Sequence, residues 1–132
     1  MSYCALIFDI KNSRDLKERY AIQLKVLSSI KLANEKFNNI IISPFMFTTG
    51  DEWEGLLIHP CDYFQIIAFF KKAIPEVDIY CGVGIGGLSI SDLTLTVNQL
   101  DGSVFHRARE ALNYSKAKNI PLTLISNSWK DI

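Results

Sequence analysis

The apolar and polar positions of the first forty residues predict a strand followed by a long helix. Residues 3–8 form a continuous apolar run that ends at Asp9, which is typical of a buried strand. Asn12, Ser13 and Asp15 then supply the polar residues that begin a helix. Apolar positions recur every three or four residues, which predicts a helix of about six turns with one buried face. These positions are Leu16, Tyr20, Leu24, Leu27, Ile30, Ala33 and Phe37.

The next stretch predicts a hairpin and a second helix. Runs 40–48 and 53–58 are β-prone, and Gly50 in their short connection allows the positive φ angle of a tight turn. Pro60 ends the second run, and Asp62 is placed to cap a helix. The expected buried positions of that helix are Phe64, Ile67, Ala68, Phe70 and Ile74.

Strict alternation at 77–86 predicts a further strand with one unusual face. The apolar face carries Val77, Ile79, Cys81, Val83 and Ile85. The opposite face carries Asp78, Tyr80, Gly82, Gly84 and Gly86. Because glycine offers no side chain to pack, this face predicts the close approach of a ligand, a helix or a partner subunit. Packing of a large side chain such as Trp53 or Phe47 over the glycines explains the pattern equally well.

The last third of the chain predicts a connection, a helix and a strand. Residues 88–100 form the connection, Asp101 precedes the helix, and 120–126 is a strand. The buried stripe of the helix is Val104, Ala108, Ala111 and Ser115. The resulting order β-α-β-β-α-β, with an added helix and strand, is the ferredoxin-like or split βαβ pattern of an α+β fold. We expect a single domain over 1–132.

Composition restricts the cellular setting. Hydrophobic residues make up 48% of the chain, enough for a core, and no apolar run is long enough to span a membrane. Lys plus Arg and Asp plus Glu each number 14, so no net charge attracts nucleic acid or an anionic membrane. The N-terminus has no signal-peptide pattern. Cys4, Cys61 and Cys81 are predicted to be buried free thiols, so we expect a reducing, cytoplasmic location.

The strongest functional signal is a pair of acidic clusters at the ends of predicted strands. Asp9 follows the first strand, while Asp51 and Glu52 lie in the hairpin connection, so neighbouring strand ends can bring their carboxylates together. Mg²⁺ is usually held by one or two protein carboxylates, with water and phosphate completing its shell. We therefore predict a nucleotide site with Mg²⁺ or Mn²⁺ on Asp9 and Asp51, assisted by Glu52. Glu54 is expected to be a solvated strand residue.

Other kinds of site have little support. The sequence contains no Ser-His-Asp order, P-loop or zinc pattern. His59 is interpreted as an ordinary loop residue. His106, Arg107 and Arg109 lie near one another on the third helix, where one of them could meet phosphate, although basic residues on a surface helix are usually only solvated.

Several of these motifs resemble those of nucleotide cyclases. Phe-Asp-Ile at 8–10 resembles the first-strand metal motif of class III nucleotide cyclases, and Thr-Gly-Asp at 49–51 resembles their glycine-aspartate hairpin. The glycine-rich strand at 82–87 and the helix at 102–109 are similar too. Residues 49–53 also resemble the GGDEF signature of diguanylate cyclases, which share the same core.

A second resemblance covers nearly the whole chain. Asp-Ile-Lys-Asn-Ser-Arg at 9–14, Gly-Asp-Glu-Trp-Glu-Gly-Leu-Leu at 50–57 and Ala-Arg-Glu-Ala at 108–111 together resemble the bacterial SatD family. Proteins of that family have no settled activity, and many carry a tail that resembles a helix-turn-helix. This chain ends at Ile132 and is expected to lack the tail.

The cyclase resemblance implies a site and an assembly. It implies that Asp9 and Asp51 bind metal and that the turn at 10–13 faces a triphosphate. The implied nucleotide-binding residues are Ile10, Lys11, Asn12, Ser13, Gly50 and Arg109. Class III cyclases build their site across a two-fold dimer, so a homodimer with this site near the interface is expected. The glycine face of the sheet, with Phe47 or Trp53, is expected to be left for a ligand or partner.

Three cyclase positions depart from the pattern and leave two hypotheses. The adenine-selecting lysine is replaced by Phe47, the asparagine by His106, and the arginine by Glu110, with Arg109 one residue early. The first hypothesis is a regulatory domain that binds a nucleotide and a divalent metal, with weak or no phosphoryl transfer. The alternative is a degenerate, non-catalytic module for dimerisation or protein interaction. The departures favour the second for catalysis, and the retained carboxylates favour the first for binding.

Overall fold

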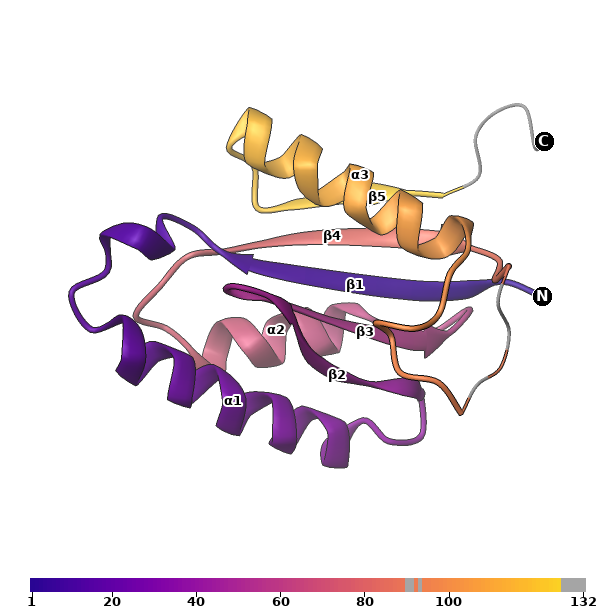
Figure 1. The fold of residues 1–132 in the computed structure, drawn as a ribbon, viewed down its shortest axis with the longest axis horizontal. Helices are drawn as coiled ribbons and strands as arrows, with labels where there is room; N and C mark the ends of the chain where they lie inside the picture. Colours follow the sequence, from indigo (N-terminus) through magenta and orange to yellow (C-terminus); the bar gives the residue numbers. More distant parts are fainter. Residues whose placement is uncertain (90–91, 93, 127–132) are drawn as a thin grey trace.

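One five-stranded sheet with three helices forms the molecule (Figure 1). The computed structural model describes residues 1–89, 92 and 94–126. In chain order the elements are β1 (Tyr3–Ile10), the short 3-10 helix η1 (Ser13–Asp15), α1 (Arg19–Lys36), β2 (Ile41–Thr49), β3 (Glu52–Ile58), α2 (Phe64–Ala73), β4 (Ile79–Gly86), α3 (Ser103–Lys118) and β5 (Leu122–Ile125). The predicted α+β fold, a βαββαβ core with an added helix and strand, is confirmed.

The strand order is β2-β3-β1-β4-β5, with β1 in the middle. The first four strands are antiparallel to their neighbours, and β5 runs parallel to β4 after the α3 crossover. Asp9 lies inside β1, where it pairs with Glu52 of β3 and Tyr80 of β4. This register brings the end of β1 beside the hairpin, as the two acidic clusters predicted.

Helices cover both faces of the sheet. Helices α1 and α2 lie on one face and α3 on the other (Figure 1). Alternate residues of β1 enter two separate cores: Leu6 and Phe8 pack with α1 and α2, whereas Ala5 and Ile7 pack with α3. The sheet therefore has no face left open to solvent along its centre.

Helix α1 begins later than predicted, and its predicted apolar stripe is buried only in its second half, at Ile30, Ala33 and Phe37. Leu16 is extended after η1, so the apolar positions counted from it do not share one helical phase. Val26, Ile30 and Ala33 are buried as α1 packs toward the sheet. The prediction that three further positions are buried is wrong. Those exposed positions are Tyr20 (74% exposed), Leu24 (47%) and Leu27 (53%).

Helix α2 matches its prediction in part. Ile67, Phe70 and Ile74 are buried as expected. Phe64 and Ala68 are exposed instead, because they lie on the side of the helix away from the sheet. Ile66, which the sequence analysis left out, is buried. The N-cap position is Tyr63 and has no side-chain capping bond, so the predicted cap at Asp62 is absent.

The glycine face of β4 is covered by α3. A methyl group on Gly82 would lie 2.4 Å from the carbonyl oxygen of Ala108, and one on Gly84 would lie 2.2 Å from that of Val104. Of the four predicted causes of the glycine pattern, a ligand, a helix, a partner subunit or a large side chain, close approach by a helix is therefore correct. The prediction that this face is uncovered, with Phe47 or Trp53 on it, is wrong, because Trp53 stacks on Phe8 on the opposite face and Phe47 packs against the same core.

The remaining fold predictions have simple outcomes. Cys4 and Cys81 are buried free thiols, while Cys61 is free but half-buried. The last strand is shorter than 120–126, at Leu122–Ile125. The predicted connection at 88–100 falls partly on residues 90, 91 and 93, which lie outside the described residues. No helix in the described part of the chain is both long and apolar enough to cross a membrane.

Candidate functional site

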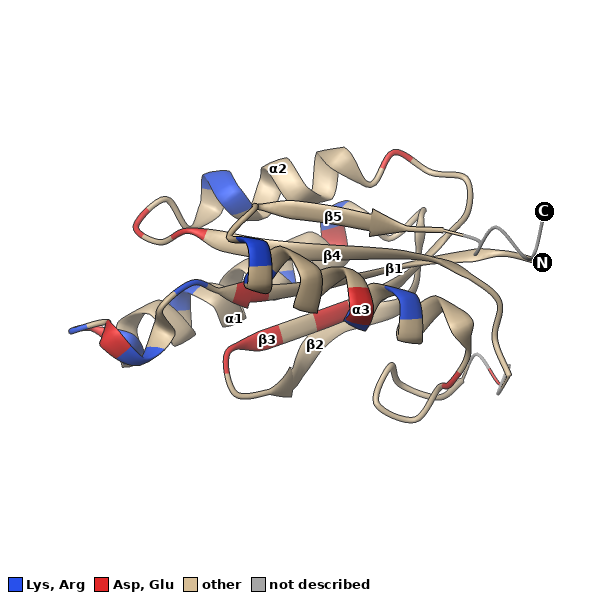
Figure 2. Ribbon diagram, turned by 90° about the horizontal axis from the view of Figure 1, so that it is seen from above, with Lys and Arg blue, Asp and Glu red and all other residues tan. Residues whose placement is uncertain are grey.

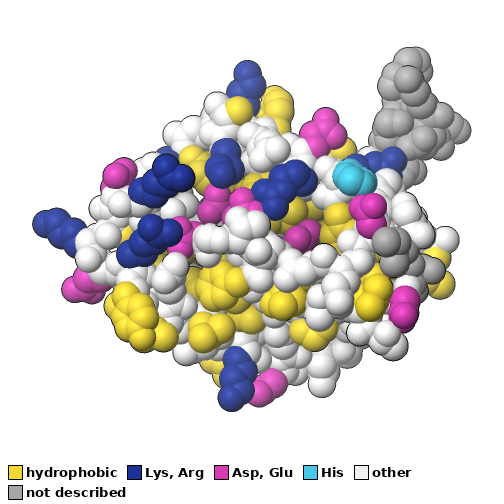
Figure 3. All heavy atoms as spheres, viewed as in Figure 1, with side chains coloured by type: hydrophobic (Ala, Val, Ile, Leu, Met, Phe, Trp, Pro, Cys, Tyr) yellow, Lys and Arg dark blue, Asp and Glu magenta, His cyan; other side chains and the backbone are white. Residues whose placement is uncertain are grey.

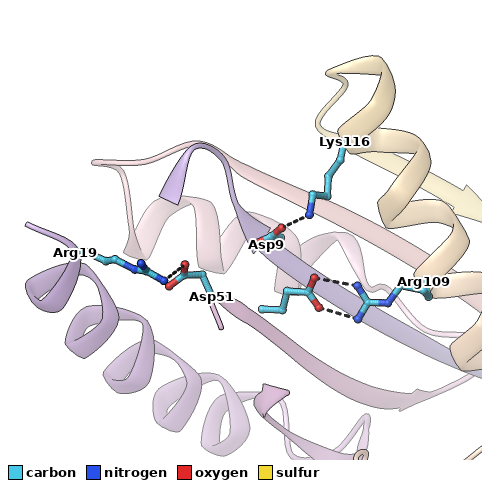
Figure 4. Close-up of polar contacts among 6 residues, drawn as sticks. Asp9, Arg19, Asp51, Arg109 and Lys116 are labelled. Atoms are coloured by element: carbon cyan, nitrogen blue, oxygen red, sulfur yellow. Dashed lines mark hydrogen bonds and ion pairs between the residues drawn. The ribbon is translucent and has the colours of Figure 1, made fainter. Parts of the chain in front are cut away.

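Asp9 is a buried carboxylate on the α3 side of the sheet. It is the second-last residue of β1, only 8% exposed, and points to the same face as Ala5 and Ile7. Lys116, two helical turns after Arg109 on α3, reaches down so that its Nζ lies 2.8 Å from Oδ2 of Asp9 (Figure 4). A buried carboxylate needs a cation or hydrogen-bond donors, and here Lys116 supplies the charge.

Glu52 lies beside Asp9 and is paired with Arg109. The guanidinium donates two hydrogen bonds, Nη1 to Oε1 at 2.9 Å and Nη2 to Oε2 at 2.7 Å. Such a bidentate pair fixes both side chains in one plane. The hydrogen bond to Glu52 is the main cause that raises the pKa of Arg109 above its ordinary value. Arg109 is therefore held on Glu52.

Glu54 adds a third acidic side chain to this face. It is 8% exposed, so the prediction of a solvated strand residue is wrong, because α3 covers this side of β3. Burial raises the pKa of Glu54 to about 7, which the positive charge of Arg109 partly opposes and the negative charge of Glu52 reinforces. In Figure 2 the acidic positions of β3 lie beneath α3, which carries basic positions.

Asp51 is held by α1 on the other side of the hairpin. Gly50 has a φ of 50°, the left-handed conformation predicted for this turn, and Asp51 follows with 6% exposure. Arg19 donates to Oδ2 at 2.9 Å and Gln23 to Oδ1 at 3.0 Å. Burial raises the pKa of Asp51, but hydrogen bonds from Ser13 and Gln23 and the charge of Arg19 outweigh it and lower the pKa.

The two predicted metal carboxylates therefore face different cations. Figure 4 shows Asp9 directed at Lys116 of α3 and Asp51 directed at Arg19 of α1. Among the described residues, no three His, Cys, Asp or Glu side chains form a cluster that could hold a metal ion. The carboxylate oxygens are of the kind that Mg²⁺ takes. Their present contacts do not fit an ion between Asp9 and Asp51, and the metal assignment stays a prediction.

A pocket of about 480 Å³ opens over the turn that follows β1. Its lining residues are Asp9, Ile10, Asn12, Ser13, Arg14, Asp15, Tyr80 and Lys116. Four residues predicted from the sequence thus meet in one pocket of the size that small ligands occupy. They are Asp9, Ile10, Asn12 and Ser13.

The other predicted residues lie around this pocket. Lys11 lines a neighbouring pocket of about 470 Å³. Gly50 lines a hollow of about 290 Å³ next to α1, and Arg109 is engaged by Glu52. His106 lies nearer the start of α3, where its Nε2 is 3.1 Å from Asp101 Oδ1, and Arg107 donates to the carbonyl of Ile85.

Sequence reasoning missed four residues of the pocket, Arg14, Asp15, Tyr80 and Lys116. A signal existed for two of them. Lys116 follows Arg109 by seven residues, which places both on one side of a helix. Tyr80 alternates with the glycines, which places it on the face of the sheet that Asp9 occupies. Arg14 and Asp15 show no comparable pattern.

The sequence matches the SatD family over residues 3–121, nearly the whole chain. The chain belongs to the SatD family. A search of curated proteins finds no match. The resemblance noted from the 9–14, 50–57 and 108–111 motifs is thereby confirmed.

Solved structures with the same fold are cyclase-like domains. A bacterial light-regulated adenylyl cyclase matches this SatD chain with a TM-score of 0.62 at 12% identity, covering 93% of this chain and 74% of the other. An EAL/GGDEF domain protein from M. capsulatus matches with a TM-score of 0.59 at 12% identity, covering 96% and 86%. The guanylate cyclase domain of RhGC from Catenaria anguillulae gives 0.54 at 15% identity, covering 85% and 72%. At these identities the likeness shows the fold alone.

Proposed function

We propose that this SatD domain binds a nucleotide through its phosphate groups, in the pocket over the turn after β1. The observation that carries the proposal is the meeting of Asn12, Ser13 and Arg14 with Lys116 in that one pocket. The ammonium and guanidinium groups offer the charge, and the amide and hydroxyl offer the hydrogen bonds, that phosphate oxygens require.

The fold neighbours support a nucleotide as the source of the phosphate. One is a guanylate cyclase domain solved in complex with GTP, and another is a GGDEF domain solved in complex with c-di-GMP. In the proposed function the SatD domain uses the same general fold for recognition, and its role is regulatory.

We propose weak or no phosphoryl transfer. Catalysis of that reaction depends on charges positioned around the transferring group. Arg109 is committed to Glu52, and the next residue, Glu110, is acidic where the cyclase pattern has arginine. Release of pyrophosphate from ATP or GTP is therefore expected to stay well below about 1 s⁻¹, the lower end of ordinary enzyme turnover.

Divalent metal is not required in this proposal. The carboxylate oxygens of Asp9, Asp51 and Glu52 are the ones that Mg²⁺ or Mn²⁺ would use, but each carboxylate is already paired with a basic side chain of the same chain. A metal ion would have to displace Lys116 from Asp9 and Arg19 from Asp51. We expect Lys116 to supply near the phosphate the positive charge that a metal ion supplies in other sites.

Thermal unfolding with and without ligand tests the proposal. ATP, GTP or tripolyphosphate at 100 times the dissociation constant should stabilise the domain by about 2.7 kcal/mol, in EDTA as well as with Mn²⁺. Lys116→Gln should reduce the shift, whereas Lys118→Gln, the same charge change two residues along α3, should not. Absence of a shift with every one of these ligands would contradict nucleotide binding.

A second candidate function is supported by an exposed apolar patch beside the hairpin. The hollow of about 290 Å³ is lined by Tyr20, Leu24 and Leu27 of α1 and by Phe47 of β2. Figure 3 shows apolar side chains gathered over this part of the molecule. Tyr20, Leu24 and Leu27 are four and three residues apart and so lie on one side of α1. That side can pair with α1 of a second copy, antiparallel, about a two-fold axis.

Sedimentation tests this homodimer. Leu24→Lys should shift a dimer to monomer, whereas Leu32→Lys, at another exposed leucine of α1 outside the hollow, should leave it intact. A monomer at tens of micromolar for the unaltered chain would contradict the second candidate, and the nucleotide proposal would stand unchanged.

A further inference from the structure

A second pocket adjoins the phosphate pocket and has no role in the function proposed so far. It has a volume of about 470 Å³ and lies where β4 begins. The turn after β1, the start of β4 and the end of α3 lie together at one end of the sheet (Figure 1). Tyr80 lines both pockets, so the two pockets are neighbours at this residue.

The walls of the second pocket combine apolar surface with a fixed polar edge. Val77, Ile79 and Pro121 supply the apolar part. The Tyr80 hydroxyl donates a hydrogen bond to Oδ1 of Asn119 at 2.8 Å. Because the oxygen of the Asn119 carboxamide accepts this bond, its NH₂ group is the part that can donate to a ligand.

Asn119 itself is held rigidly. It ends α3 in the left-handed conformation, with a φ of 54°, and its backbone N–H donates to the carbonyl of Ser115. The side chain of Lys11 lies near the same tyrosine, with Nζ 6.0 Å from the ring centroid. An aromatic ring, a fixed carboxamide and apolar walls are the groups that bind a flat heterocycle with polar edges.

We propose that the nucleobase of the ligand lies in this second pocket, against Tyr80 and in hydrogen-bond reach of Asn119. The inference rests on the proposed function, because it places the phosphates in the first pocket. The inference also agrees with the replacement of the base-selecting lysine of the cyclase pattern by Phe47. Phe47 lines a hollow with few polar groups, and in this proposal it does not contact the base.

Competition between ligands with and without a base separates this inference from the function it rests on. The affinity for tripolyphosphate reports binding in the phosphate pocket alone. The ratio of ATP or GTP affinity to tripolyphosphate affinity reports the contribution of the base to binding. We expect at least one of the two nucleotides to bind about tenfold more tightly than tripolyphosphate, which is the size of one stacking contact with its hydrogen bond.

Variants then assign the base to its pocket. Asn119→Gly removes the carboxamide and tolerates the positive φ angle, so it should lower the ratio several-fold with tripolyphosphate affinity unchanged. Tyr80→Phe keeps the ring and should have a smaller effect on the ratio than Tyr80→Leu. Phe47→Ala should leave the ratio as it is. The melting temperature of each ligand-free variant confirms folding.

The outcomes are distinguishable. A ratio near one, or a ratio that falls with Phe47→Ala and not with Asn119→Gly, would overturn the base assignment while tripolyphosphate binding upholds the phosphate pocket. Failure of tripolyphosphate and of both nucleotides to bind would overturn the proposed function and this inference together.

Discussion

The two faces of the sheet differ most at the end where β1 meets the hairpin, although the same strands build both. Toward α2, Phe8 stacks on Trp53 with ring centroids 5.4 Å apart, and Phe70 lies 4.9 Å from Phe8. Toward α3, the neighbouring residue on each strand is a carboxylate: Asp9 follows Phe8, and Glu52 precedes Trp53. Adjacent residues of each strand therefore point to opposite faces, one into the apolar core and the other into the charged site.

This difference shows how a small sheet can be stable and still hold buried charge. The α2 face buries large aromatic surface, which is the main source of folding free energy. The α3 face holds its carboxylates against cations, an arrangement that adds little net stability because of the desolvation cost. Predictions for the two faces therefore differ in kind, stability on one and charge on the other.

The largest effect is expected on the aromatic face. Trp53→Ala should lower the free energy of unfolding by about 3–5 kcal/mol, because it removes a fully buried indole that contacts both Phe8 and Phe70. Urea denaturation measures this. Phe64→Ala is the control, since Phe64 is an exposed aromatic on α2, and should cost less than about 0.5 kcal/mol. Equal effects of the two would contradict the assigned core.

The packing of α3 on β4 should be the next most sensitive feature. Gly84→Ala should destabilise by about 1–3 kcal/mol, because its methyl group meets the backbone of α3 and that helix must shift. Gly87→Ala, where the nearest atom would lie 3.8 Å away, should be tolerated. The same denaturation experiment decides it, and a neutral Gly84→Ala would show that α3 lies farther from the sheet.

The sequence predicts the features of this fold that depend on neighbouring residues better than those that depend on contacts between distant parts of the chain. Alternation at 77–86 and the stripe of Val104 and Ala108 are local patterns; the strand is confirmed over Ile79–Gly86, two residues shorter than predicted, and the stripe is buried. That α3 meets the glycines, and that Lys116 reaches Asp9, depends on how distant elements pack. The first half of the predicted α1 stripe was wrong because Leu16 is extended after η1 and the helix begins only at Arg19, so the spacing counted from Leu16 does not continue along one helix.

The candidate site was predictable to the same extent. Strand ends identified Asp9 and Asp51, and the register confirms that β1 and the hairpin are neighbours. Which cation each carboxylate meets could not be read from spacing, since Arg19 and Lys116 come from helices on different sides of the sheet.

Stability against pH should reveal the charged face. Glu54 has a pKa of about 7 in the folded protein and an ordinary value of 4.5, so the folded state holds its proton longer. Stability from this group is present below pH 4.5 and is lost as pH rises to about 7. The free energy of unfolding of Glu54→Gln, relative to that of the unaltered chain, should therefore rise by about 1–3 kcal/mol between pH 5 and pH 8.

Asp51 supplies the comparison of opposite sign. Its pKa is lowered, so its contribution is present above the ordinary pKa of 3.8 and is lost only as pH falls below that value. Asp51→Asn should therefore leave the difference between pH 5 and pH 8 unchanged. If Glu54→Gln behaves like Asp51→Asn over this interval, Glu54 is ionised throughout and the buried position assigned to it is contradicted.

The sign of the Asp9→Asn effect tests the central claim most directly. In calorimetric titration with tripolyphosphate in EDTA, the account predicts binding by the unaltered chain and about tenfold weaker binding by Lys116→Gln, which loses one charge-assisted contact. Asp9→Asn should bind several-fold more tightly, because it removes a negative charge and frees Lys116. No binding without Mn²⁺, together with loss of binding in Asp9→Asn, would contradict the account and assign Asp9 to a metal ion.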